Sequence, residues 1–122
     1  LFCQSAWSAL GSSQGQIVNI SSVSGVRGFP GGAAYCASKF GLNGLSEVLR
    51  LEGKPIGVRV VTVCPGPVST PIWETRADAA ALSKMMSAAE IADLVVSLVS
   101  TPRSIDLDPV IVSNFQDPWK TD

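Results

Sequence analysis

The sequence contains no histidine and a single tyrosine, and its nine basic residues are balanced by ten acidic ones. The absence of histidine excludes Ser-His-Asp and Cys-His nucleophilic catalysis and removes most zinc sites, so no metal site is predicted. Acid–base chemistry near neutral pH must then come from carboxylates, lysine, cysteine or an activated tyrosine. Tyr35 is the one phenol that could serve.

Charge and hydropathy exclude two further classes of protein. The basic residues are scattered among the acidic ones, and the net charge of −1 argues against a nucleic-acid partner. No apolar run is long enough to span a bilayer and no leader segment is visible, so we expect no membrane attachment. The three cysteines lack CxxC spacing, which indicates reduced thiols in a cytoplasmic protein.

Three segments rich in β-branched residues predict the strands of a parallel sheet. They are residues 16–20, 58–64 and 110–112. A helix expected over residues 34–52 connects the first two strands, and this order requires a crossover connection. Gly53 is expected to be the C-cap of that helix, and Pro55 is expected to prevent its continuation.

Other signals place the remaining elements. Residues 1–10 are typical of the end of a helix that started earlier, and residues 11–15 are expected to form a turn. Thr70-Pro71 predicts an N-cap followed by proline at the first helical position. Ser87-Ala88-Ala89-Glu90 is a capping box that opens an amphipathic helix, and Thr101-Pro102 ends that helix.

The helix expected over residues 34–52 has more apolar positions than one buried stripe requires. Its apolar members are Phe40, Leu42, Leu45, Val48, Leu49 and Leu51. This distribution predicts burial on two sides and therefore a subunit interface. A helix buried wholly inside its own subunit is the alternative.

One stretch of the chain carries a constellation of chemical groups. Tyr35 and Lys39 are four residues apart and so share a helix face, and Ser22 lies thirteen residues before Tyr35, just after a predicted strand. A nearby cation favours the phenolate form of a tyrosine, which makes the phenol usable as a proton donor or acceptor. A serine hydroxyl could hold a substrate oxygen beside it. The pattern is suited to moving a proton on and off a carbonyl or alcohol oxygen.

These residues carry a resemblance to a known family. Asn19-Ile20-Ser21-Ser22, Tyr35-Cys36-Ala37-Ser38-Lys39 and Pro65-Gly66 resemble the second half of a short-chain dehydrogenase/reductase. The resemblance covers nearly the whole chain and is weakest in its last fifteen or so residues. It implies a doubly wound, Rossmann-type parallel α/β sheet. Residues 1–122 would be a single partial domain, the C-terminal half, with the N-terminal nucleotide-binding half missing.

The resemblance also implies a role for each matching residue. Tyr35 would be the general acid/base, Lys39 would activate it and bind the ribose of NAD or NADP, and Ser22 would orient the substrate carbonyl. Further cofactor contacts would come from Pro65, Gly66, Val68 and Thr70. Trp73 would line the substrate pocket within a mobile lid over residues 72–86, although ordinary packing explains it equally well.

The implied activity is NAD(P)(H)-dependent interconversion of a carbonyl and a secondary alcohol. The intact protein would form homo-oligomers through the helix 34–52, whereas the isolated fragment is expected to be inactive. Two alternatives stay open: a truncated, non-catalytic interaction module, and an epimerase or dehydratase acting on a nucleotide sugar. Because enoyl reductases carry the Tyr/Lys pair further apart, the spacing favours enzymes of carbonyls and alcohols.

The sequence departs from the family pattern in three places. No glycine-rich phosphate loop of the form GxGxxG is present, and no residue that would distinguish NAD from NADP can be assigned. The asparagine that usually completes the site falls outside the chain, and Asn19 does not replace it. Residues 67–122 contain no glycine, so the final strand lacks its usual glycine flank.

Overall fold

The computed structural model describes residues 2–119 of the chain. In chain order the elements are α1 (Phe2–Ser13), β1 (Gln16–Ile20), η1 (Val23–Gly25), α2 (Ala33–Gly53), η2 (Lys54–Ile56), β2 (Arg59–Pro65), β3 (Val68–Ser69), η3 (Pro71–Trp73), α3 (Ala79–Ser83), β4 (Met86–Ser87), α4 (Ala88–Val99) and β5 (Val110–Val112), where η marks a short 3₁₀ helix.

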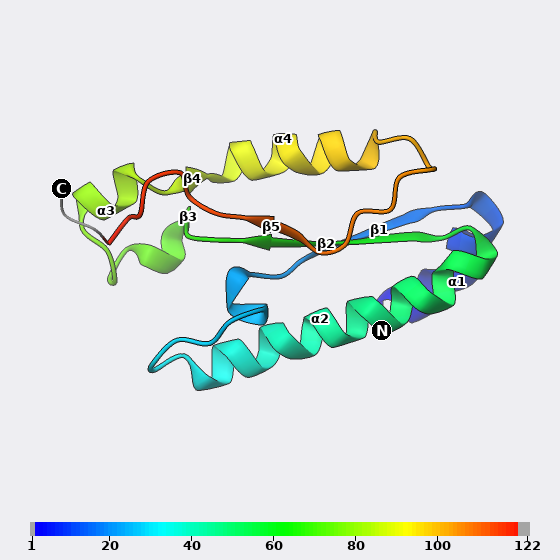
Figure 1. Cartoon of the computed structure of the whole chain (residues 1–122), viewed down its shortest axis with the longest axis horizontal. Helices are drawn as coiled ribbons and strands as arrows, with labels where there is room; N and C mark the ends of the chain where they lie inside the picture. Colours follow the sequence, from blue (N-terminus) through cyan, green and yellow to red (C-terminus); the bar gives the residue numbers. More distant parts are fainter. Residues whose placement is uncertain (1, 120–122) are drawn as a thin grey trace.

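The main sheet has the strand order β1-β2-β5, and both pairings are parallel. Helix α4 covers one face of this sheet, and α1 and α2 lie on the other face (Figure 1). The expected α/β architecture with a parallel, doubly wound sheet is therefore confirmed. The predicted outer strands have the observed bounds, and the central strand is displaced from its prediction by one residue.

Strand β2 is the centre of the core because all seven of its residues are buried. Val61 and Val63 pack with Leu98 of α4, and other apolar side chains surround this cluster: Val18, Leu94, Leu107, Val110 and Val112. Fully burying a valine stabilises the fold by about 1.5–3 kcal/mol relative to leaving it exposed. A continuous β-branched run is what a strand covered on both faces requires.

Two predicted helix ends differ from the observed ones. Helix α1 continues to Ser13, and the turn comes only at Gln14, which has a φ of 51°. Gly53 is not a left-handed C-cap, because α2 passes directly into η2. Pro55 lies in the first turn of η2, where a backbone N–H is not needed for a helical hydrogen bond. Gly57, with a φ of 76°, makes the actual reversal. Close packing favours glycine at position 53, since a Cβ there would lie 2.9 Å from the Val58 carbonyl oxygen.

The guanidinium of Arg59 joins three elements at the amino edge of the sheet. It donates to Gln16 Oε1 at the start of β1, and also to carbonyl oxygens at the end of α4, among them Leu98 O and Thr101 O. A cation at the C-terminus of a helix complements the helix dipole and the unpaired carbonyls there. Arg59 is accordingly buried, with 9% of its surface exposed.

Helix α2 is not buried on both sides by residues 2–119. Four of its apolar side chains are about half exposed, namely Phe40, Leu45, Val48 and Leu51. Its other side packs on η1 and β2, as expected for a helix against a sheet. The predicted subunit interface through this helix stays a prediction. Separately, none of the helices within residues 2–119 is long and apolar enough to cross a membrane.

Candidate active site at the carboxyl edge of the sheet

The loop after β1 fixes Ser22 at the carboxyl edge of the sheet. The N–H of Ser21 donates to Val63 O of β2 at 2.7 Å, which extends the parallel ladder by one residue. Ser22 is the N-cap of η1, and its Oγ accepts a hydrogen bond from the Ser24 N–H at 3.1 Å. The Ser22 side chain is thus buried and held in place, while its own O–H remains able to donate.

Close packing at Gly25 presses this loop against α2. A Cβ on Gly25 would lie 2.8 Å from both Lys39 O and Asn43 Nδ2, too close for any larger residue without displacement. Asn43 Nδ2 donates to Gly25 O at 2.9 Å, and Ser21 Oγ donates to Lys39 O at 3.4 Å. These contacts set the distance between the serine loop and the helix that carries Tyr35 and Lys39.

The first turns of α2 hold Tyr35 and Lys39 side by side. Lys39 Nζ lies 5.8 Å from the centroid of the Tyr35 ring and donates to Ile20 O, the last residue of β1, at 3.2 Å. One ammonium proton is therefore engaged, and two remain for a ligand. The Tyr35 side chain is 42% exposed, and its phenol oxygen makes no hydrogen bond to any of residues 2–119, Ser22 included.

The loop after β2 reaches the same edge. Pro65 is buried at the end of β2, and the Gly66 N–H donates to Val112 O of β5 at 2.7 Å. Thr70 is the N-cap residue of η3, as its sequence position indicates, but its hydroxyl donates to Val68 O instead of capping the helix. Val68 and Thr70 are both partly exposed and so accessible from this edge.

Trp73 packs on the C-terminal segment. Its ring lies 5.6 Å from that of Trp119 at an interplanar angle of 55°. It belongs to an excursion that leaves the sheet at β3 and returns at β4, two short strands that pair in parallel. No sequence pattern predicted this strand pair or the contacts of Asn43 and Asn114. Asn43 could have been noticed, because it follows Lys39 by one helical turn.

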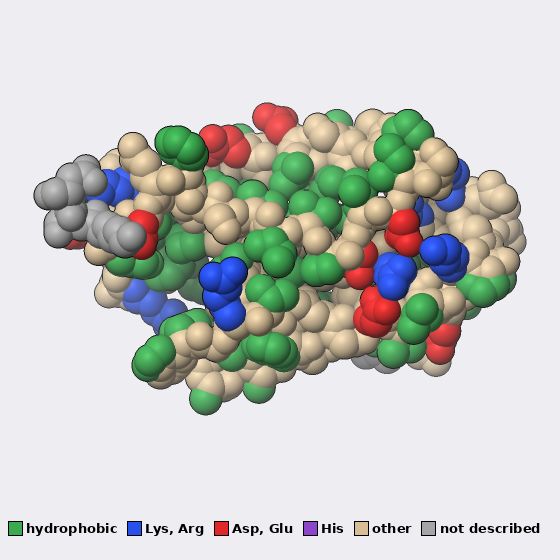
Figure 2. All heavy atoms as spheres, in the orientation of Figure 1, with side chains coloured by type: hydrophobic (Ala, Val, Ile, Leu, Met, Phe, Trp, Pro, Cys, Tyr) green, Lys and Arg blue, Asp and Glu red, His purple; other side chains and the backbone are tan. Residues whose placement is uncertain are grey.

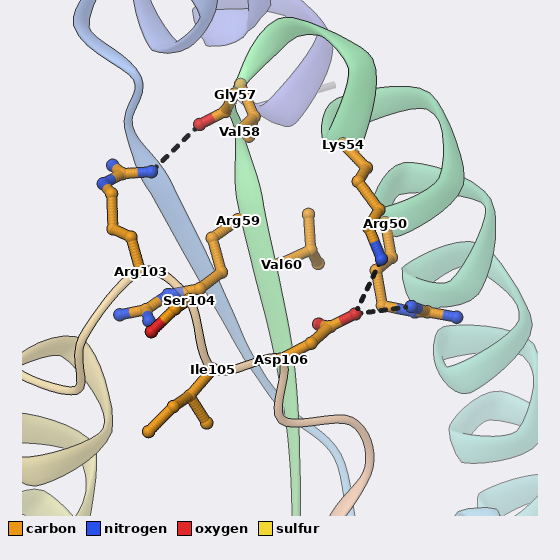
Figure 3. Close-up of a pocket in the computed structure, with 10 residues that line it drawn as sticks. All are labelled: Arg50, Lys54, Gly57, Val58, Arg59, Val60, Arg103, Ser104, Ile105 and Asp106. Carbon is orange, nitrogen blue, oxygen red and sulfur yellow. Dashed lines mark hydrogen bonds and ion pairs between the residues drawn. The ribbon is translucent and has the colours of Figure 1, made fainter.

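A separate hollow lies at the amino end of β2, away from these residues. It has a volume of about 210 Å³, and Arg50, Lys54, Arg103 and Asp106 are among its lining residues (Figure 3). Asp106 Oδ2 accepts from Arg50 Nη1 at 3.1 Å and from Lys54 Nζ at 3.2 Å. The hydrogen bond and charge of Arg50 also lower the pKa of Glu47. Since Arg50 and Lys54 are already engaged in ion pairs with Glu47 and Asp106, the carboxyl edge remains the candidate site.

The model of the family described as short chain dehydrogenase matches residues 1–81, about two thirds of the chain. The chain belongs to the short chain dehydrogenase family. The matched segment contains Ser22, Tyr35, Lys39 and the Pro65-Gly66 loop.

Curated relatives of this family agree with that membership. An uncharacterized oxidoreductase, Lmo0432, from Listeria monocytogenes is 32% identical over 115 residues, which are 86% of this chain and 46% of the relative. Trans-4-hydroxycyclohexanecarboxylate dehydrogenase from Sinomonas cyclohexanicum is 35% identical over 99 residues, covering 79% of this chain and 38% of that protein. The chain thus spans about half, or less, of the length of these relatives.

Solved structures of the family share the fold. A 4-hydroxyisoleucine dehydrogenase complexed with NADH superposes with a TM-score of 0.75 at 27% identity, over 93% of this chain and 52% of the other. The expected Rossmann-type fold is therefore confirmed.

Proposed function

We propose that the protein containing this chain is an NAD(P)(H)-dependent oxidoreductase that interconverts a carbonyl and a secondary alcohol. One observation supports this most directly: Lys39 is fixed to the end of β1 beside Tyr35, whose phenol oxygen is left open for a ligand. Ser22 is buried at the same strand end. Ligands of open parallel α/β sheets bind at this edge.

The residues present fit a nicotinamide dinucleotide. Lys39 retains donors that could reach ribose hydroxyls, and the loop of Pro65, Gly66, Val68 and Thr70 lies beyond the neighbouring strand end. The bound cofactor would supply hydride to the carbonyl carbon or accept it from the alcohol. A structural relative is described as complexed with NADH, and the choice between NAD and NADP stays open.

The chain's own residues would then handle the proton and the substrate oxygen. In reduction, Tyr35 donates its phenolic proton to the carbonyl oxygen, and Ser22 donates a hydrogen bond to the same oxygen. The ammonium of Lys39 stabilises the phenolate that results. Oxidation reverses these steps. A positioned acid/base pair of this kind accelerates a reaction roughly 10²–10⁴-fold.

The substrate class follows from this chemistry. A small molecule with a ketone or secondary alcohol would lie between Ser22 and Tyr35, with residues 72–86 as its lid. Two of the relatives are named as dehydrogenases of hydroxylated compounds, in agreement with such a substrate. Trp73 would contribute an apolar wall from within the lid.

The test is Tyr35→Phe in the full-length protein, which removes one oxygen from a partly exposed side chain. We expect turnover to fall by at least about 10²-fold, because general acid catalysis is lost. The melting temperature should change little, since the phenol makes no hydrogen bond within residues 2–119. The assay follows NAD(P)H absorbance with a panel of ketones and secondary alcohols.

Lys54→Ala is the matched control, because Lys54 is an exposed lysine far from the proposed site. It should keep its activity, whereas Lys39→Ala should lose most of it. If Tyr35→Phe retained most of its hydride transfer, the proposed acid/base role would be wrong.

Assembly and location are part of the same proposal. The exposed apolar side of α2 supports a homo-oligomer formed through the helix 34–52, and sedimentation of the full-length protein tests it. That surface would equally serve a non-catalytic interaction module, in which case no cofactor would bind. We further propose a cytoplasmic location, supported by three cysteines that are all free thiols, to be tested by fractionation.

A further inference from the structure

Asn114 connects the two limbs of the segment that leaves the sheet after β2. It lies two residues beyond β5, and its Nδ2 donates to Pro67 O at 2.9 Å and to Lys84 O at 3.3 Å. Pro67 immediately precedes β3, and Lys84 lies two residues before β4. One side chain therefore contacts both the departing and the returning limb of the segment 68–86.

The orientation of this amide is determined by its two acceptors. With the nitrogen toward the two carbonyls, both contacts are hydrogen bonds; a flipped amide would place oxygen against oxygen at both. The observed orientation leaves Oδ1 buried without a hydrogen-bond partner, the one side-chain atom in this condition within residues 2–119. An unpaired buried acceptor is unfavourable, so the two contacts of the nitrogen must outweigh it.

Gly66 is adapted to the same side chain. A Cβ on Gly66 would lie 2.7 Å from Asn114 Oδ1, whereas its next neighbours, Val112 O and Asn114 N, would be at 3.4 and 3.7 Å. The φ of Gly66 is not positive, so its backbone conformation does not require glycine. The close approach of Asn114 is what makes a larger residue unfavourable there.

Among residues 2–119, a short strand pair also joins the two limbs at the base of the segment. The strands β3 and β4 pair over two residues only, Val68 with Met86 and Ser69 with Ser87. The Met86 N–H donates to Pro67 O at 3.3 Å, so this carbonyl is shared with Asn114. Loss of the amide would remove two hydrogen bonds from the base of the segment.

We propose that Asn114 is a positioning residue that closes the base of the segment 68–86, which contains the substrate lid of residues 72–86, and holds this segment against the Pro65-Gly66-Pro67 loop. Its role in catalysis rests on the proposed function, because the lid acts on substrate only if the carboxyl edge is the active site. Asn114 acts through the lid and not on the reacting atoms. Its loss therefore weakens substrate binding more than it slows the chemical step.

Hydrogen exchange in the full-length protein without ligand tests the clamp. Asn114→Ala removes both donors, and Asn114→Asp keeps the shape while replacing the donor with an acceptor. In both variants we expect the amides of Met86 and of its neighbours in the lid to exchange about tenfold faster, because the two hydrogen bonds from Asn114 Nδ2 are lost. Ser113→Ala is the control, since Ser113 is the exposed neighbouring residue.

A double-mutant cycle provides a second, independent measurement. Gly66→Ala alone should lower the melting temperature, because its Cβ meets Asn114 Oδ1. In the Asn114→Ala background, Gly66→Ala should lower the melting temperature much less, since the obstructing atom is gone. Additive effects, or unchanged lid exchange in both Asn114 variants, would overturn the proposal.

Kinetics separate this proposal from the proposed function. With an active enzyme, Asn114→Ala should raise the KM for the carbonyl substrate about tenfold and lower kcat by less. If lid exchange responds as expected but no substrate is turned over by the unmodified protein, the clamp stands and the enzymatic proposal fails. If turnover is normal and KM and exchange are unaffected by Asn114→Ala, the clamp fails and the enzymatic proposal stands.

Discussion

At the scale of single residues, the candidate site depends on small side chains as much as on reactive ones. Ser22 and Lys39 are brought together because Gly25 allows the loop after β1 to approach α2 closely. The side chains of Ser22 and Lys39 make no hydrogen bond with each other. The Ser22 Oγ accepts from the Ser24 N–H, and the Lys39 Nζ donates to Ile20 O. Their relative position is thus a property of backbone packing.

Gly25→Ala tests that dependence. A Cβ at 2.8 Å from Lys39 O must displace either η1 or α2, and forced overpacking of this kind costs about 1–3 kcal/mol. We expect a lower melting temperature, and a loss of turnover larger than the loss of folded protein, because Ser22 moves relative to Tyr35. Thermal unfolding and steady-state kinetics of the full-length protein measure the two effects.

Gly28→Ala is the matched control for this substitution. Gly28 lies in the same loop, nothing lies within 4 Å of the position of its added Cβ, and its φ is not positive. Stability should therefore stay within about 0.5 kcal/mol of the unmodified protein. Equal losses of stability in Gly25→Ala and Gly28→Ala would show that contact with α2 is not what requires glycine in this loop.

The spacing of Tyr35 and Lys39 could be predicted because positions i and i+4 of a helix are fixed neighbours. The position of Ser22 followed from the rule that parallel strands end at one edge. By contrast, Asn114 is 47 residues from Pro67 along the chain. No local pattern encodes such a contact, so its role became apparent only in the folded structure.

At the scale of elements, the helix and strand predictions were correct where residues close together in the sequence determine the element. The capping box at the start of α4 has both expected hydrogen bonds, from Glu90 N–H to Ser87 Oγ and from Ser87 N–H to Glu90 Oε2. The strands β3 and β4 could not be predicted, since two-residue strands are defined by their mutual pairing and not by a hydrophobic period.

The capping box predicts a pH dependence. The Ser87 N–H, and then its hydroxyl, hold the pKa of Glu90 below its ordinary value. A lowered pKa in the folded state means that the carboxylate stabilises the fold above the unfolded-state pKa of about 4.3. This contribution disappears as the pH falls through the lower folded pKa. Glu90→Gln should therefore be less stable than the unmodified protein at pH 7 and 5, with the difference shrinking toward pH 3.

Thermal unfolding across that pH range provides the measurement, with helix α4 followed by hydrogen exchange. Asp93→Asn is the control, because Asp93 is an acidic residue on the same helix but outside the capping box. A difference between Glu90→Gln and the unmodified protein that persisted undiminished at pH 3 would contradict the assigned hydrogen bonds.

At the scale of the whole molecule, the chain exposes more surface than its mass warrants. Its accessible surface is 7722 Å², whereas a compact monomer of 12.7 kDa exposes about 6,200 Å². Apolar side chains form part of the visible face between α2 and α4 (Figure 2). Phe2 of α1 is 94% exposed, and no residue of α1 is buried.

The sheet has an open edge as well. Strand β1 pairs with β2 on one side only, and no strand among residues 2–119 covers its other side. Unpaired N–H and C=O groups along such an edge favour association with other chains. The described residues also contain no glycine-rich phosphate loop that could anchor a dinucleotide.

We therefore expect residues 1–122 expressed alone to show no NAD(P)H turnover and to unfold or associate more readily than the full-length protein. The full-length protein, assayed with the same carbonyl and alcohol panel, is the control. Light scattering measures association, and denaturant titration measures stability. Measurable NAD(P)H turnover by the purified fragment would contradict the expectation, because it would mean that the carboxyl edge binds the cofactor without a separate pyrophosphate site.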